Sequence, residues 1–289
     1  MPPDVEPPHP GLAWLAGSPS GRAWLNRLPR LLDECAAQWS LRLEKPFAYA
    51  FASLVLPART AGGEEVVLKL GFPDRESEHE GAALARWNGD GAVSLLASDA
   101  ERRALLLERC QPGTALSEFE AGAALEVLTG LLPRLWVPTG RPFRTLAEEA
   151  AWWASSLPRQ YEDAGRPFDR RLLDTALDAL HVLAPSQGEA VLLHQDLHGD
   201  NVLRAEREPW LVIDPKPLVG EREFGIAPIV RSPELGHSRR EVVGRLDRLT
   251  GALGLDRERA RLWTLAQTIA WSDCRHARHI EIADWLLTA

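Results

Sequence analysis

The stretch HQDLHGDN, residues 194–201, places two histidines, two aspartates and an asparagine within eight positions. Read as a strand, its alternation would put His194, Asp196 and His198 on one face, as the ligands of a metal hydrolase could be arranged. Read as a loop, it presents a carboxylate at Asp196 and a carboxamide at Asn201. Both structures are compatible with these eight residues, so the remainder of the chain has to distinguish them.

Composition narrows the class of protein. The chain has 289 residues, 45% hydrophobic and 26% charged, which is typical of a globular protein with one large domain or two lobes. Its net charge of -8 argues against a general nucleic-acid or anionic-membrane surface and is compatible with a cationic ligand. The three cysteines are odd in number and far apart, which indicates neither a disulfide framework nor a CxxC metal site: Cys35, Cys110 and Cys274.

The start of the chain and its apolar runs bear on the cellular location of the protein. The proline-rich start MPPDVEPPHP lacks the charged and apolar regions of a signal peptide, and no apolar run reaches membrane-spanning length. We therefore expect a cytoplasmic protein without a membrane partner, active as a monomer or weak dimer.

The first part of the chain has the pattern of a small sheet with few helices. A helix is expected over 20–41, followed by β-rich runs 47–58 and 64–72, which the turn-like RTAGG would join as a hairpin. Lys69 falls on the second of these strands. A helix over 74–87 and two strands, within 92–99 and 101–110, complete this part.

Long helical patterns follow the breaker QPG at 111–113. They cover 117–136, 144–165 and 169–184, and resume from about residue 239 to the end. The two short apolar runs between them, 190–197 and 209–216, predict strands on either side of HQDLHGDN. We therefore expect an α+β fold with a sheet-containing unit over 1–109, whose first 18 residues form a flexible tail, a linker at 110–113, and a mainly helical unit over 114–289.

The order of these parts favours phosphoryl transfer. That reaction needs a cation for the nucleotide phosphates, an acid that holds the cation, a base for the acceptor hydroxyl, and oxygen ligands for Mg²⁺. The chain has only three lysines, and Lys69 stands on a strand before a helix rich in glutamates. The spacing H-x-D-x-x-x-x-N is followed by an apolar strand that ends at Asp214. A metal hydrolase would leave Lys69, Asn201 and Asp214 without a function, and a nucleotide-binding module would not need the base.

A resemblance supports this interpretation. HQDLHGDNVL followed by WLVIDPKPLVGEREFG resembles the aminoglycoside phosphotransferases, in the subgroup of streptomycin 6-phosphotransferases and hydroxyurea-type antibiotic kinases. The similarity extends through VVLKL, WNGDGAVSLL and ALLLERCQPGTAL, from about residue 45 onward. It implies ATP-dependent O-phosphorylation of a small molecule and a bilobal protein-kinase-like fold. In that fold 1–109 would be the nucleotide-binding lobe, 110–113 the hinge, and 114–289 the helical catalytic and substrate-binding lobe.

The resemblance also implies roles for individual residues. Asp196 would be the catalytic carboxylate that orients the substrate hydroxyl and accepts its proton. Asn201 and Asp214 would bind Mg²⁺, since hard oxygen ligands suit this ion. His194 would brace the loop.

For the nucleotide, the resemblance implies that Lys69 holds the phosphates of ATP or GTP. Its partner would be Glu80, although Glu76 and Glu78 stay open as alternatives. The hinge would meet the adenine edge through the backbone of two residues, Glu108 and Cys110.

Two departures from protein kinases are evident. The first hairpin has no glycine between Lys45 and Leu56. Protein kinases cover the phosphates with a glycine-rich loop, so here the coverage of the phosphates by FAYAFAS is inferred only from the position of this stretch. The metal-binding strand ends in Asp-Pro-Lys, which leaves Lys216 open as a phosphate contact or an exposed turn residue.

The acceptor is predicted from the helical lobe. The stretch AWSD resembles the corresponding helix of the streptomycin kinases and suggests Trp271 and Asp273 as substrate contacts, with Glu221 and Glu223 as further acids. These acids would pair with the guanidinium groups of a streptomycin-type aminoglycoside. Hydroxyurea or another small alcohol is the alternative acceptor, and a metal-dependent hydrolase is the less favoured alternative function.

Overall fold

The computed structural model describes residues 9–49 and 51–289. The chain divides into two compact units between Gln111 and Pro112, within the stretch expected to be a hinge. Each unit has its own buried hydrophobic residues.

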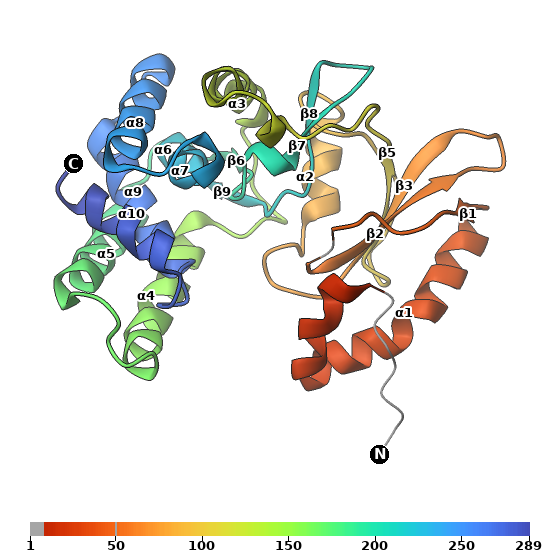
Figure 1. Cartoon of the computed structure of the whole chain (residues 1–289), viewed down its shortest axis with the longest axis horizontal. Coiled ribbons are helices and arrows are strands. Elements are labelled where there is room, and N and C mark those ends of the chain that lie inside the picture. Colours follow the sequence, from red (N-terminus) through yellow and green to blue (C-terminus); the bar gives the residue numbers. More distant parts are fainter. Residues whose placement is uncertain (1–8, 50) are drawn as a thin grey trace. The chain divides into compact units, whose positions relative to one another are not determined.

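The first unit is built on a five-stranded sheet in the order β1-β2-β3-β5-β4 (Figure 1). All neighbouring strands are antiparallel. Their bounds are Arg42–Leu43 (β1), Ser53–Arg59 (β2), Glu65–Gly71 (β3), Leu95–Asp99 (β4) and Ala104–Glu108 (β5). The expected hairpin is confirmed as β2 and β3, with Val55 opposite Lys69. Gly63 in its turn has a positive φ of 86°, which glycine adopts without a steric cost.

A helix and a 3-10 helix pack against this sheet. Helix α1 spans Pro19–Gln38, and the 3-10 helix η1 spans Pro10–Gly17. Leu12, Leu15 and Leu28 are fully or almost fully buried and form one cluster with Leu54 and Leu68 of the sheet. The expectation of a flexible tail up to residue 18 is therefore wrong for η1, because two leucines anchor it; residues 1–8 lie outside the described part.

The second helix of this unit is shorter than predicted. Helix α2 spans Glu80–Trp87 and does not begin at residue 74. Instead, one carboxylate oxygen of Asp74 accepts the backbone N–H groups of Glu76 and Ser77, and the other accepts the Ser77 hydroxyl. This side-chain turn competes with helix formation and delays the helix start.

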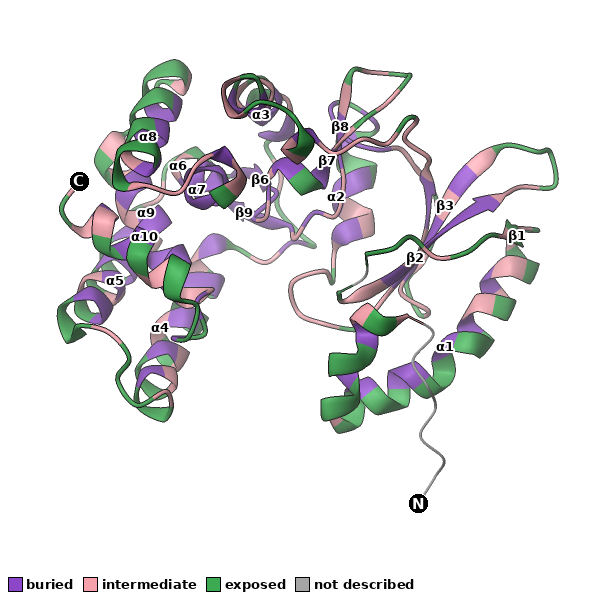
Figure 2. Cartoon of the chain, viewed as in Figure 1, coloured by how far each residue is buried: buried purple, intermediate pink, exposed green. Residues whose placement is uncertain are grey.

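The second unit is mainly helical. The longer helices are α3 (Ala121–Leu135), α4 (Leu146–Asp163), α5 (Arg170–Leu183), α8 (Arg239–Leu253), α9 (Arg257–Ala270) and α10 (Ala277–Leu287), with short helices α6 (Arg222–Gly225) and α7 (Ala227–Arg231). Helix α9 packs against α5, α7, α8 and α10, and most of its residues are buried (Figure 2). Three aromatic rings pack in this core: Trp153, Phe224 and Trp263.

Two small ladders flank the stretch HQDLHGDN, residues 194–201. Strand β6 (Val191–Leu193) pairs with β9 (Leu218–Gly220), and β7 (Val202–Arg204) pairs with β8 (Trp210–Val212). Residues 194–201 connect β6 to β7 and contain only a 3-10 turn, Gly199–Asn201. HQDLHGDN is therefore a loop. Among the described residues, no helix has the length and apolar character needed to cross a membrane.

Candidate active site

Asp196 is surrounded by positive groups within the second unit. The Lys216 ammonium lies 2.5 Å from Oδ2, whereas the Arg231 guanidinium lies 3.7 Å from Oδ1 and His198 Nε2 lies 3.8 Å from the same oxygen. Lys216 follows the β8 strand and Arg231 ends helix α7. Tertiary structure thus adds two cations to the carboxylate that the sequence motif provides.

The charges around Asp196 control its protonation. Burial by itself would raise the pKa of this carboxyl, but Lys216, His198 and Arg231 together outweigh burial and lower the pKa below its usual value. The carboxylate is consequently ionised at neutral pH, as a residue that accepts a hydroxyl proton must be.

His194 holds the loop from inside. Its Nε2 lies 2.9 Å from the carbonyl oxygen of Ile213, and its Nδ1 accepts the backbone N–H of Asp196 at 3.2 Å. Burial lowers the pKa of His194 to about 4, so the ring is neutral, with Nε2 as the donor. Both ring nitrogens are hydrogen-bonded to the backbone. His194 can therefore brace the loop, and it has no ring nitrogen left to bind a metal ion.

Asn201 and the end of strand β8 are brought together by a backbone hydrogen bond. The N–H of Ile213 donates to the carbonyl of Asn201 at 2.9 Å, which places Asp214 beside the loop. The Asn201 side-chain amide donates to the carbonyl of Asp196 at 2.8 Å, so its Oδ1 is the atom left to act as a ligand. One carboxylate and one amide oxygen suit Mg²⁺ when phosphate oxygens complete the shell.

Other contacts fix the same loop. Ser117 donates a short hydrogen bond to Asp200, and the N–H of Gly199 donates to Glu234 at 2.9 Å. A Cβ on Gly199 would lie 2.8 Å from the backbone nitrogen of Ser117, so only glycine fits there. Asp200 therefore has a structural contact that sequence reasoning did not assign.

In the first unit, the partner of Lys69 is Glu80. The ammonium lies 2.6 Å from the Glu80 carboxylate, and both side chains are buried. Glu76 and Glu78 lie before helix α2, in the turn that Asp74 organises. This distance therefore supports Glu80 as a partner of Lys69, as expected.

The expected adenine contacts lie at the end of strand β5. The N–H of Glu108 donates to the carbonyl of Ser94 at 3.0 Å, and its carboxylate accepts the N–H of Ser94 at 2.9 Å. The N–H of Glu108 is thus engaged within the sheet. Its carbonyl and the backbone of Cys110, one residue before the first unit ends at Gln111, stay the candidates for a base contact.

Trp271 and Asp273 lie in different environments, although they are two residues apart in the sequence. The Trp271 ring lies beneath the Arg231 guanidinium, 4.4 Å from ring centroid to Cζ, with Lys216 Nζ at 5.8 Å. Asp273 is exposed, has a φ of 48°, and lines a hollow of about 390 Å³ with Gln160, Asp163 and two further residues, Arg275 and His276. Only Trp271 is linked to Asp196 by these contacts.

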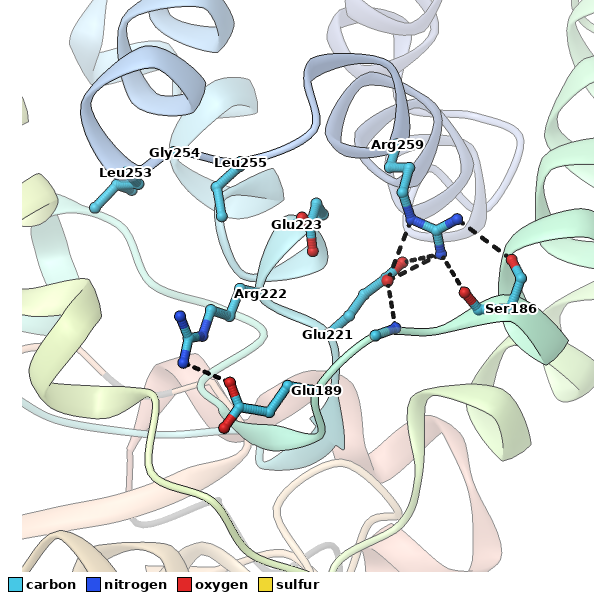
Figure 3. A pocket seen from close by; sticks show the side chains of 10 residues that line it. Ser186, Glu189, Glu221, Arg222, Glu223, Leu253, Gly254, Leu255 and Arg259 are labelled. Carbon is cyan, nitrogen blue, oxygen red and sulfur yellow. Dashed lines mark hydrogen bonds and ion pairs between the residues drawn. The ribbon is translucent and has the colours of Figure 1, made fainter.

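Glu221 is occupied by internal partners (Figure 3). Its carboxylate is 2% exposed, forms an ion pair with Arg259 at 2.7 Å, and accepts hydrogen bonds from the Trp263 indole and the Gly188 backbone. These contacts favour a structural role for Glu221, and its expected substrate role stays a prediction.

Arg231 was not predicted from the sequence. Lys216 was conspicuous because lysine is rare in this chain, and it was open as a phosphate contact or an exposed turn residue. No local pattern marks Arg231, because 35 residues separate it from Asp196 and only the packing of helix α7 brings it near.

Comparisons with known proteins place the chain in a family. A family model described as aminoglycoside/hydroxyurea antibiotic resistance kinase matches residues 38–278. A hydroxyurea phosphotransferase of Kitasatospora aureofaciens is 44% identical over 260 residues, which cover 88% of this chain and 74% of that protein. A streptomycin 6-kinase of Streptomyces griseus is 40% identical over 261 residues, which cover 88% of this chain and 85% of that protein.

Solved structures confirm the predicted fold class. The choline kinase LicA of Streptococcus pneumoniae has a TM-score of 0.63 at 12% identity, covering 91% of this chain and all of that one. A thermostable mutant of an aminoglycoside phosphotransferase, solved with ADP and hygromycin B, has a TM-score of 0.60 at 13% identity, covering 88% and 97%. At such identities the likeness establishes the kinase-like α+β fold alone.

Proposed function

Since the chain belongs to the aminoglycoside/hydroxyurea antibiotic resistance kinase family and is a phosphotransferase with an alcohol group as acceptor, we propose that it phosphorylates a hydroxyl group of a streptomycin-type aminoglycoside. The observation that carries the proposal is the ionised Asp196, held in a braced loop next to Asn201 and Asp214. ATP is the expected donor, with GTP as the alternative nucleotide.

The chemistry follows from these groups. The acceptor oxygen forms a bond to the γ-phosphorus as the bond to the β-phosphate oxygen breaks, ADP leaves, and the hydroxyl proton passes to Asp196. Asn201 and Asp214 would hold Mg²⁺, which supplies positive charge to the phosphate oxygens. Lys69, fixed by Glu80, would hold the nucleotide phosphates from the first unit. Positioning and charge therefore provide most of the catalysis.

Two observations favour a cationic acceptor. The relatives include streptomycin 6-kinases from two Streptomyces species, each 40% identical to this chain. The net charge of -8 attracts cations, and Asp273 is an exposed acid on a hollow of the helical unit. Hydroxyurea is the second candidate, because the 44% identical relative is a hydroxyurea phosphotransferase. We expect the protein to act in the cytoplasm as a monomer or weak dimer.

An acceptor panel tests the proposal. Purified protein, γ-labelled ATP and Mg²⁺ are incubated with streptomycin, other aminoglycosides, hydroxyurea or choline, and transfer of label is measured. We expect streptomycin to be the best acceptor and Asp196→Asn to abolish transfer while nucleotide binding persists. Preferred labelling of hydroxyurea would refute the aminoglycoside assignment, and transfer by Asp196→Asn at the wild-type rate would refute the role of Asp196.

A further inference from the structure

Both oxygens of Asp196 face a cation, and the two cations share one aromatic ring. Lys216 contacts Oδ2 and Arg231 lies nearest to Oδ1. The guanidinium of Arg231 and the ammonium of Lys216 both lie over the indole of Trp271. These residues come from three separate segments of the second unit: the connection between β8 and β9, the end of α7 and the end of α9.

The two oxygens of Asp196 are not equivalent. The 2.5 Å separation from Lys216 is that of a short charge-assisted hydrogen bond, which commits Oδ2 to the ammonium. Arg231 and His198 lie 3.7 and 3.8 Å from Oδ1, beyond ordinary hydrogen-bond length. Oδ1 is therefore the oxygen that can accept a hydrogen bond from an incoming hydroxyl group.

We propose that Lys216 is a positioning residue for the transfer reaction: it fixes the rotation of the Asp196 carboxylate so that Oδ1 receives the acceptor proton, and Trp271 holds Lys216 and Arg231 in place. The inference rests on the proposed function. Without the ammonium, the carboxylate could rotate about its terminal torsion, which is soft, and would populate orientations that do not meet the hydroxyl.

The alternative is that the Lys216–Asp196 pair only stabilises the fold. The side chains of Asp196 and Lys216 are 15% and 23% exposed, so the pair is mostly buried. Removal of the ammonium leaves a mostly buried carboxylate without its nearest cation, and this can also lower stability. The positioning role is therefore tested by kcat per folded protein, which a purely stabilising role would leave unchanged when Lys216 is replaced.

The arrangement also constrains the acceptor. Lys216 and Arg231 repel a positive group placed beside the reacting hydroxyl. If the acceptor is a streptomycin-type molecule, its guanidinium groups must point away from this cluster, toward acids elsewhere on the helical unit.

Lys216→Ala and Lys216→Gln test the inference against the best acceptor of the panel. A base contributes about 10²–10⁴-fold to such a reaction, and we expect the loss of its orientation to lower kcat by roughly ten- to hundredfold with little change in the KM for ATP. Thermal unfolding of each variant is measured in parallel. A kcat within about twofold of wild type in both variants, or a loss of kcat that follows a loss of folded protein, would overturn the inference.

Chemical rescue gives a readout that a structural role would not affect. Ethylammonium or propylammonium should restore part of the kcat of Lys216→Ala, because each carries donor N–H groups that can occupy the vacated space. Tetramethylammonium, which has the charge but no N–H group, should not. Equal stimulation by all three ions, or none by any, would contradict the positioning role.

Trp271 supplies a matched pair of variants. Its Nε1 has no hydrogen-bond partner within the described residues, so Trp271→Phe keeps an aromatic face and loses no such bond. We expect a smaller loss of kcat for Trp271→Phe than for Trp271→Leu, because phenylalanine keeps an aromatic face for the two cations. Equal losses would contradict the role of Trp271 in holding Lys216 and Arg231 in place. If the wild-type protein labels no acceptor, the proposed function is refuted. If the wild type and the Lys216 variants are equally active, the proposed function stands and only the inference about Lys216 is refuted.

Discussion

The ammonium of Lys69 lies 2.6 Å from the carboxylate of Glu80, which is the first residue of helix α2. The antiparallel register opposes Lys69 to Val55 on one side and to Leu105 on the other, so the lysine lies on a central strand. Because both side chains are buried, the pair has one geometry and cannot easily exchange with water.

Lys69→Arg is therefore expected to impair the enzyme although it keeps the charge. A planar guanidinium is longer and cannot occupy the site of a compact ammonium beside Glu80. We expect a loss of roughly hundredfold in kcat/KM, the size associated with a displacement of about 1 Å in an active site. Steady-state kinetics with varied ATP measure it, with the exposed Lys45 replaced by Arg as the control. Unchanged kinetics would show that Lys69 has no part in the reaction.

The free energy of unfolding should decrease as the pH is lowered, because His194 is buried in its neutral form. Its pKa is about 4 in the folded protein and 6.5 as the usual value, so the unfolded chain binds the proton first as the pH falls. Stability is therefore complete above about pH 6.5 and decreases toward pH 4, by about 2 kcal/mol between about pH 7 and about pH 5. Urea unfolding at a series of pH values measures this slope.

A variant isolates this contribution from that of His279, whose pKa burial also lowers to about 4. His194→Gln should be less stable at neutral pH and should show a shallower slope than wild type. His181→Gln, at an exposed position of helix α5, should keep the wild-type slope. A slope unaltered in His194→Gln would contradict the neutral, buried state of the ring.

Glu221→Gln is expected to destabilise the helical unit without a selective effect on either substrate. The substitution removes the charge that faces Arg259, whose side chain is 25% exposed. Removal of one partner of a fully buried pair costs about 3–5 kcal/mol, and with partial exposure of Arg259 we expect about 2 kcal/mol. Thermal or urea unfolding measures the loss, and Glu223→Gln, at the neighbouring acid of the same pocket (Figure 3), is the control. A raised KM for the acceptor alone would return Glu221 to the substrate site.

Asp273→Asn should weaken the binding of a cationic aminoglycoside. Asparagine tolerates the positive φ of this position, so the backbone should be retained. An exposed ion pair contributes up to about 1 kcal/mol, which limits the rise in the acceptor KM to about fivefold. The effect should decrease as salt rises, and the KM for ATP should not change. Asp178→Asn, at an exposed position of helix α5, is the control, and equal effects of the two variants would remove Asp273 from the acceptor site.

The sequence by itself determined the parts of this protein that depend on local patterns. The β-rich composition of the β2 and β3 runs and the turn-like RTAGG between them predicted the hairpin that carries Lys69. This prediction rests on composition and turn chemistry, which act over a few residues. The eight residues 194–201 did not distinguish a strand from a loop by themselves, and the order of Lys69, the H-x-D-x-x-x-x-N spacing and Asp214 along the chain favoured the phosphoryl-transfer loop. The start of α2 and the helix η1 were predicted wrongly, because a side-chain turn at Asp74 and the burial of two leucines outweigh local propensity.

Only the tertiary structure decided which charges meet. Lys216, Arg231 and Trp271 surround Asp196 although up to 75 residues separate them, and Glu221 is withdrawn into a pair with Arg259. A charge on a helix end or turn has the same local sequence signal whether it is solvated, paired or catalytic. The energies that distinguish these states come from burial and from distances between segments, and both arise only when the helices pack.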